Sequence, residues 1–166
     1  MISAAHRLPA PRHLAKIAPP DDALARIAAL PRPLVFTNGV FDVLHRGHVS
    51  CLEQARALGA SLVVAVNSDA SVRRLGKGDE RPFNPLADRM AVLAGLAAVD
   101  LVVPFDGDTP RDLVVACRPD VLVKGGDYTA ATTAGASEVI AAGGRFVAIP
   151  FLSPHSSSAL IERLRG

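Results

Sequence analysis

The stretch Thr37–His48 reads TNGVFDVLHRGH and ends in two histidines separated by an arginine and a glycine. Two histidines at this spacing could bind a ligand or take part in a reaction. A neutral imidazole donates one hydrogen bond, so two imidazoles one helical turn apart could hold the oxygens of a phosphate. Gly39 and Gly47 would let the backbone approach such a ligand closely. Three interpretations are open for this pattern: surface histidines, ligands of a zinc ion, or a phosphate site.

The rest of the sequence does not support a protein-bound metal. A zinc site needs a third protein ligand, and His6, His13 and His155 lie in contexts that suggest none. Cys51 and Cys117 stand alone without CxxC spacing, which argues against both a disulfide framework and a thiolate metal site. We therefore expect two buried free thiols and no metal-ligating residue.

Further polar residues that could contact an acidic ligand occur in short clusters along the chain. Lys77 could reach phosphates, although a solvated surface lysine is the alternative. Lys124 could contact a ligand or form an ion pair with Asp127, and Asp42 could orient an imidazole, bind sugar hydroxyls or cap a turn. The remaining candidates lie in VNSD, DERP, NPLADR and SPHSSS: Asn67, Asp69, Arg81, Arg89, Ser156, Ser157 and Ser158.

The elements that must position these residues follow from short apolar runs. We expect five buried strands at 34–36, 62–66, 100–105, 121–124 and 145–149. Helical spacing or helix-start residues predict helices at 48–58, from 84 onward, at 109–117, 135–142 and 156–164, after a short helix that follows Asp21 and Asp22. Apolar strands that alternate with helices indicate an α/β fold, a Rossmann-like doubly wound parallel sheet with helices on both faces.

This fold would bring the polar clusters together. Ligands of such sheets bind beyond the carboxyl ends of the strands, where the topology changes direction. Polar loops follow the first, second, fourth and fifth predicted strands, so four loops should converge on one pocket. If the helix begins at His48, its free backbone N–H groups face the same space and favour an anion.

Length and composition limit the classes of protein. A chain of 166 residues suits one domain, which we place at residues 21–166 after a loosely ordered, proline-rich arm over residues 1–20. With 49% hydrophobic residues, 20% charged residues and a net charge of +2, the sequence predicts a folded protein that does not bind nucleic acid. It contains neither a secretory signal nor an apolar stretch long enough for a membrane, so we expect a cytoplasmic protein.

The ordered motifs TNGVFDVLHRGH, VNSD, KG…RP, NPLADR and VLVKGGDY resemble one family in particular. They are similar to the stand-alone heptose 1-phosphate adenylyltransferases of the HxGH nucleotidyltransferase superfamily. The resemblance implies transfer of AMP from ATP to D-glycero-β-D-manno-heptose 1-phosphate, giving ADP-heptose for lipopolysaccharide core synthesis. It also implies Mg²⁺ bound with ATP, a homo-oligomer and no protein-bound metal.

The resemblance assigns roles to individual residues. It makes His45, His48 and Lys77 catalytic. Nucleotide binding falls to both histidines and to Thr37, Asn38, Gly39, Phe41, Lys124, Gly126, Ser156, Ser157 and Ser158. Substrate binding falls to Asp42, Asn67, Asp69, Arg81, Arg89 and Asp127. Glycerol 3-phosphate cytidylyltransferase, FMN adenylyltransferase and a non-catalytic nucleotide-binding module are the alternatives.

Overall fold

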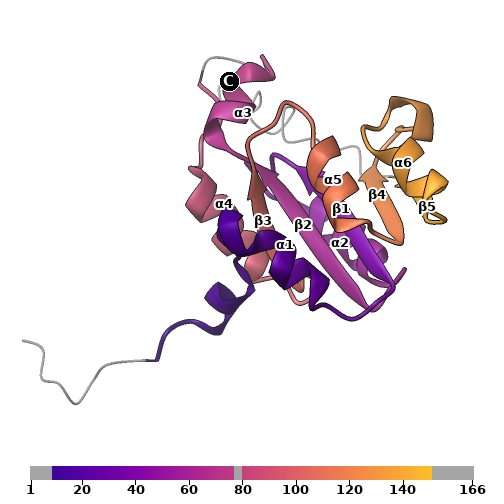
Figure 1. The fold of residues 1–166 in the computed structure, drawn as a ribbon. Helices are drawn as coiled ribbons and strands as arrows, with labels where there is room; N and C mark the ends of the chain where they lie inside the picture. The colour runs from indigo at the N-terminus through magenta and orange to yellow at the C-terminus, as the bar shows by residue number, and fades with distance from the viewer. Residues whose placement is uncertain (1–8, 77–79, 151–166) are drawn as a thin grey trace, which may run out of the picture.

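A five-stranded parallel sheet forms the centre of the computed structural model, which describes residues 9–76 and 80–150 (Figure 1). The strand order is β3-β2-β1-β4-β5, so β1 pairs with both β2 and β4 and the direction of winding reverses between β1 and β4. The strands are β1 (Leu34–Gly39), β2 (Ser61–Asn67), β3 (Leu101–Phe105), β4 (Val121–Gly125) and β5 (Arg145–Ile149). The predicted doubly wound fold is confirmed.

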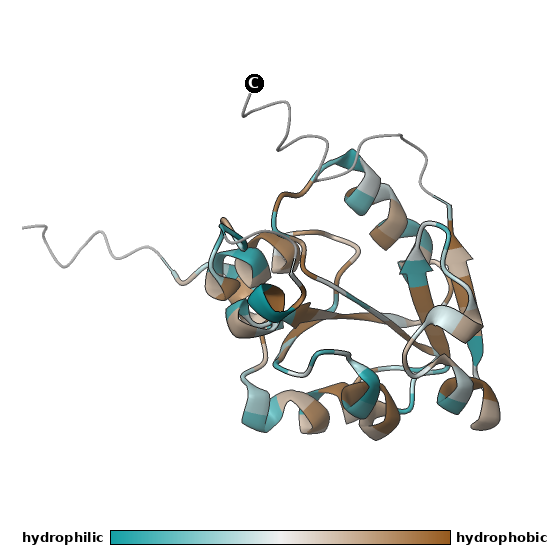
Figure 2. Cartoon of the chain, turned by 90° about the horizontal axis from the view of Figure 1, so that it is seen from above, coloured by the Kyte–Doolittle hydropathy of each residue, from teal (hydrophilic) through white to brown (hydrophobic). Residues whose placement is uncertain are grey.

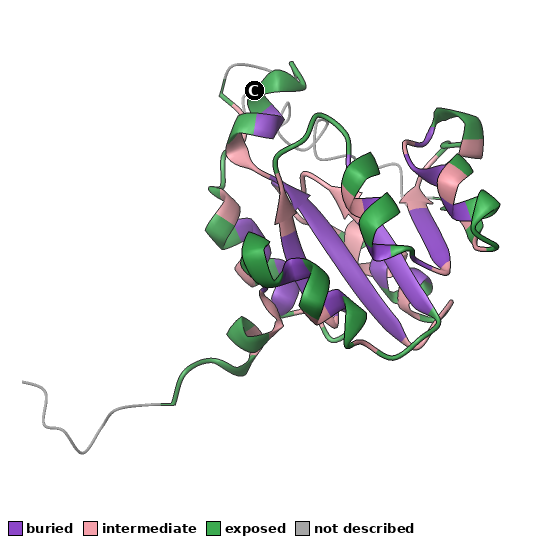
Figure 3. Ribbon diagram, in the orientation of Figure 1, coloured by how far each residue is buried: buried purple, intermediate pink, exposed green. Residues whose placement is uncertain are grey.

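Helices cover both faces because the strands are apolar on both sides. Every residue of β2 is buried, and Figure 3 shows the central strands as the most buried part of the molecule. One face packs against α1 (Pro20–Ala28), α5 (Arg111–Cys117) and α6 (Ala136–Ala141). The other packs against α2 (Arg46–Arg56) and α4 (Leu86–Ala94). Hydrophobic residues accordingly line the strands and the helix sides that face them (Figure 2).

Two elements lie in segments that the sequence predicted as loops, and one helix starts earlier than predicted. The short α3 (Asp69–Arg74) begins after Ser68, whose side chain caps it by accepting from the Ser71 N–H. The 3-10 helix η3 (Ala130–Thr132) follows β4. Helix α2 begins at Arg46 and not at His48, with His45 as its N-cap residue. The helix predicted at 156–164 lies outside the described residues.

The expectation of a loose arm over residues 1–20 needs correction in its described part. Residues Arg12–Lys16 form a 3-10 helix, η2, and Ala18 is fully buried. Ile17 pairs with Val102 of β3, and the Ala18 N–H donates to the Val102 carbonyl at 2.9 Å. This segment therefore covers the free edge of β3, a position where an unpaired strand is prone to association. Among the described residues, no helix combines the length and apolar character that crossing a bilayer requires.

Candidate active site

A cavity of about 540 Å³ opens at the carboxyl ends of the strands, where the topology predicts ligand binding. It lies beside β1, β2 and β4 and is closed by the first part of α2 and the loop that precedes α5. The predicted site residues that line it are Thr37, Asn38, Gly39, Phe41, His48, Asn67 and Lys124. The expected convergence of the loops after the first, second and fourth strands is thus present in the structure.

The two imidazoles sit together at the start of α2 and cap it reciprocally. Gly47 donates its backbone N–H to Nδ1 of His45 at 3.1 Å, and His45 donates its own N–H to Nδ1 of His48 at 3.3 Å. The two rings lie 4.0 Å apart between centroids. Because each Nδ1 accepts a backbone hydrogen bond, the proton of each neutral ring is on Nε2. Both rings thus carry a donor on the side opposite the helix.

The environment of His48 keeps its ring neutral. Burial, and to a smaller extent the neighbouring His45, lower the pKa of His48 to about 4. The Phe41 ring lies edge-on to it, with centroids 5.6 Å apart. At neutral pH, His48 is therefore a neutral hydrogen-bond donor that can hold an oxyanion through its Nε2–H.

Gly47 is required by the folded-back ring of His45. A Cβ at position 47 would lie 2.9 Å from Cε1 and 3.0 Å from Nδ1 of that ring. Any side chain here would displace the imidazole that caps the helix. The glycine of the HxGH pattern thus has a steric role, which differs from close backbone approach to a ligand.

The polar residues at the strand ends offer a different chemistry from the imidazoles. The buried Oδ1 of Asn38 has no hydrogen-bond partner among the described residues. A carbonyl oxygen needs a donor, which a sugar hydroxyl or an amino group supplies and an ionised phosphate does not. Lys124 donates from Nζ to the Asn38 carbonyl at 3.2 Å and lies 5.5 Å from the Tyr128 ring centroid. Together these groups suit the uncharged part of a ligand beside a cation.

Two predicted substrate-binding residues, Asp42 and Arg89, are buried and do not line this cavity. The Asp42 side chain is 1% exposed and accepts hydrogen bonds from the backbone N–H groups of Phe83 (3.0 Å) and Asn84 (2.9 Å). The Arg89 side chain is 0% exposed, and it donates to three backbone carbonyls and to the Asp69 carboxylate. Neither side chain faces the cavity, since their hydrogen-bonding capacity is used within the protein.

The other predicted residues that the structure describes, His45 among them, are not part of the cavity lining. Asp69 pairs with Arg89 at 2.7 Å, and Arg81 lies 3.9 Å from Asp42, so both are held by these buried groups. Gly126 has a positive φ of 99° and donates to the Ile149 carbonyl, while Asp127 is exposed. Lys77, Ser156, Ser157 and Ser158 lie outside the described residues. Their roles remain predictions.

The sequence interpretation missed one wall of the cavity. The loop after β3 contributes Asp108, Thr109 and Pro110, although only the loops after the other four strands were counted. The same rule could have found it, because the polar run DGDTP directly follows a predicted strand. Cys51, on α2, also lines the cavity, and burial raises its pKa. The described residues contain no group of three His, Cys, Asp or Glu side chains that could hold a metal ion.

A doubly wound sheet with paired imidazoles at the first helix after β1 defines the chain as a nucleotidyltransferase. The cytidylyltransferase-like family model matches residues 36–163, and the chain belongs to this family. Over 156 residues it is 55% identical to the D-beta-D-heptose 1-phosphate adenylyltransferase of Bordetella bronchiseptica, covering 93% of this chain and 96% of that protein.

Longer relatives and solved structures agree with this placement. The chain is 57% identical over 144 residues to the bifunctional protein HldE of Alkalilimnicola ehrlichii. This match covers 87% of this chain but only 30% of that protein. The lipopolysaccharide core biosynthesis protein of Thermoplasma volcanium superposes with a TM-score of 0.60 at 28% identity, covering 74% and 98% of the two chains. Pantothenate synthetase from Thermus thermophilus, at 17% identity and a TM-score of 0.59 over 89% and 70%, shares the fold.

Proposed function

We propose that the protein transfers AMP from ATP to D-glycero-β-D-manno-heptose 1-phosphate, giving ADP-heptose and pyrophosphate for lipopolysaccharide core synthesis. The assignment of the acceptor substrate rests on the 55% identity with a heptose 1-phosphate adenylyltransferase over nearly the whole of both chains. The cavity geometry supports the proposal, because the His48 imidazole, capped together with His45, lies beside amide and hydroxyl groups that suit a sugar.

In the proposed reaction, an oxygen of the sugar phosphate attacks the α-phosphorus of ATP in line. A new P–O bond forms as the bond between the α-phosphorus and the bridging oxygen breaks, and pyrophosphate leaves with that electron pair. Negative charge shifts among the phosphate oxygens during this step. The Nε2–H groups of His45 and His48 would donate to these oxygens, and Lys77 would add a positive charge.

The chain supplies preorganised hydrogen-bond donors, the two imidazole rings, to this reaction. The reciprocal cap fixes both rings before the substrates bind, so the donors need no reorganisation during transfer. Asn38 and Lys124 would hold the nucleotide at the strand ends, together with the cavity residues Thr37, Gly39 and Phe41. Gly126, which follows the cavity residue Gly125, remains a candidate for the same role. Asp127 remains a candidate for contact with the sugar because it is exposed near the cavity residue Tyr128.

Mg²⁺ fits this site as an ion that arrives with ATP. The described residues offer no carboxylate cage, and Asp108, which lines the cavity, pairs with Arg74 at 2.6 Å. Mg²⁺ commonly binds phosphate oxygens and several waters with few protein ligands. When bound, it would neutralise part of the charge on the phosphates. We also propose that the enzyme works in the cytoplasm as a homo-oligomer.

A release assay for pyrophosphate tests the proposal. The protein is incubated with Mg²⁺ and either ATP or CTP, and with heptose 1-phosphate, glycerol 3-phosphate or FMN as acceptor. We expect pyrophosphate release with ATP and the heptose phosphate and at least ~10²-fold less with the other pairs, since missing contacts in a polar site are costly. Robust turnover with another acceptor and none with the heptose phosphate would reject the assignment.

A further inference from the structure

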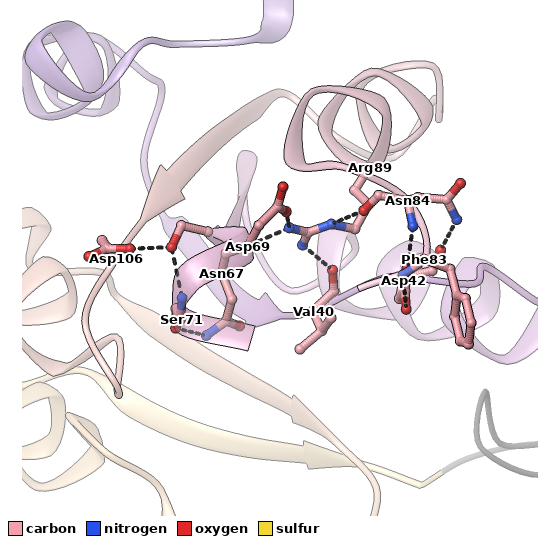
Figure 4. A network of polar contacts seen from close by, with 10 residues as sticks. Val40, Asp42, Asn67, Asp69, Ser71, Phe83, Asn84, Arg89 and Asp106 are labelled. Carbon is pink, nitrogen blue, oxygen red and sulfur yellow. Dashed lines mark hydrogen bonds and ion pairs between the residues drawn. The ribbon is translucent and has the colours of Figure 1, made fainter. Parts of the chain in front are cut away.

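Arg89 places a fully buried guanidinium beside the ends of β1 and β2 and does not line the cavity. Figure 4 shows its polar contacts. Its Nε donates to the Asn84 carbonyl at 3.0 Å, and Nη1 donates to the Val40 carbonyl at 2.7 Å. Nη2 donates to the Asn67 carbonyl at 2.8 Å and to Oδ1 of Asp69 at 2.7 Å. One side chain of α4 thus joins the ends of β1 and β2 to the start of its own helix.

Only an arginine can make this set of bonds from one position. The guanidinium is planar and offers five N–H donors in a fixed fork, whereas a lysine ammonium is a compact charge with three donors. Asp69 supplies the opposite charge that a buried cation needs. The remaining bonds go to backbone carbonyls, so the side chain fixes the path of the main chain.

The two anchored strand ends carry the cavity. Val40 lies between Gly39 and Phe41, both of which line it, and Phe41 has a positive φ of 50°, a rare conformation for an aromatic residue. The Phe41 ring in turn contacts His48 edge-on. Asn67, whose carbonyl is held by Arg89, also lines the cavity.

A second clamp holds the same loop to the same segment. Asp42 accepts from the backbone N–H groups of Phe83 and Asn84, and the Asn84 side chain donates to the Asp42 carbonyl at 2.6 Å. The loop between β1 and α2 is therefore tied at Val40 and at Asp42 to the chain that leads into α4. Arg89 is the member that also reaches β2.

We propose that Arg89 is a positioning residue for the transfer reaction, one that holds the loop carrying Phe41 and the end of β2 in the geometry that orients His48 toward the phosphates. It acts through Val40 and Asn67 and does not touch substrate. The kinetic part of its test rests on the proposed function, whereas the spectroscopic part does not.

The kinetic test compares Arg89→Lys with Arg56→Lys. Arg56 is the control because it also donates to a backbone carbonyl, that of Gly59, and pairs with a carboxylate, Asp100, at the amino ends of the strands. We expect Arg89→Lys to lower kcat by about 10-fold or more with KM for ATP changed less than about threefold, because a small misplacement of catalytic groups mainly affects the transition state. Arg56→Lys should keep the wild-type kcat.

The spectroscopic test records the imidazole ¹⁵N and ¹H signals of His48 in the absence of substrate. We expect them to shift or broaden in Arg89→Lys and to overlay with the wild type in Arg56→Lys. If Arg89→Lys does not unfold cooperatively, Arg89→Gln carries the same test, since its neutral amide needs no buried counter-charge. Wild-type kcat and unchanged His48 signals in a folded Arg89 variant would overturn the proposal. A wild-type protein inactive with heptose 1-phosphate would reject only the proposed function.

Discussion

Substituting His48 separates the two tasks that its ring performs. Nδ1 accepts the backbone N–H of His45 and caps α2, while Nε2–H is the donor proposed for phosphate. In His48→Asn, the amide oxygen can replace Nδ1 as the acceptor, but no donor reaches the Nε2 position. In His48→Gln, the amide nitrogen can reach that position, but the acceptor close to the backbone is lost.

The magnitudes follow from these two losses. Removing one preorganised donor to a transition-state oxyanion costs about 10²-fold to 10³-fold in kcat. Losing a helix N-cap interaction costs about 1 kcal/mol in the free energy of unfolding. We therefore expect His48→Asn to retain near wild-type stability with kcat lowered by at least about 10²-fold. His48→Gln should retain more kcat while losing about 1 kcal/mol of stability.

Pyrophosphate release at saturating ATP and heptose 1-phosphate measures kcat, and urea unfolding followed by circular dichroism measures stability. His13→Ala serves as a control, since His13 lies in η2, away from the cavity. The reasoning would be refuted by a folded His48→Asn variant with near-normal kcat. It would equally fail if His48→Gln lost as much kcat as His48→Asn, because the outward donor would then not be the feature that matters.

Three further predictions concern pH, sterics and the N-terminal segment. Burial lowers the pKa of folded His48 to about 4, so the unfolded chain binds a proton at this residue first as pH falls. The free energy of unfolding, measured in urea, should therefore decrease between about pH 6.5 and pH 4, whereas kcat should show no inflection near pH 6.5. Gly47→Ala should push the His45 ring from its capping position and lower kcat about 10-fold or more. A wild-type kcat would show that the ring can move without loss of activity; Gly59→Ala is not a suitable control, because a Cβ there would also clash. Ala18→Asp, which buries a carboxylate against the edge of β3, should lower the unfolding free energy by about 2 kcal/mol or more, measured beside the exposed Ala25→Asp, and equal stability of the two would show that this segment is not packed.

The architecture was predictable because the strands are short, wholly apolar runs. All five lie where the sequence places them, with boundaries that differ by at most three residues. The start of α2 was not predictable in the same way. His45 is an unusual N-cap residue, and its cap depends on an imidazole folding back over Gly47. Rules built on Ser, Thr, Asp and Asn do not find it.

The residues that line the cavity were easier to identify than the residues that hold them in place. Thr37, Asn38, His48 and Lys124 follow from their places at strand ends or at a helix start, and all four line the cavity. Asp42 came from the same loop and turned out to be buried in backbone hydrogen bonds. A polar residue in a ligand loop has the same sequence appearance whether it points toward the ligand or away from it.

Arg89, however, carried a signal that distinguishes the two cases. Leu86, Met90 and Leu93 form the apolar stripe of α4, and a residue three positions after Leu86 and four before Leu93 falls on that same side of the helix. A charge placed there must enter the core and is tolerated only if oxygens of the surrounding chain satisfy it. The carbonyls at the ends of β1 and β2 satisfy this requirement. A charged residue on an apolar helix stripe beside a predicted site is therefore expected to bond to the surrounding main chain, as Arg89 does.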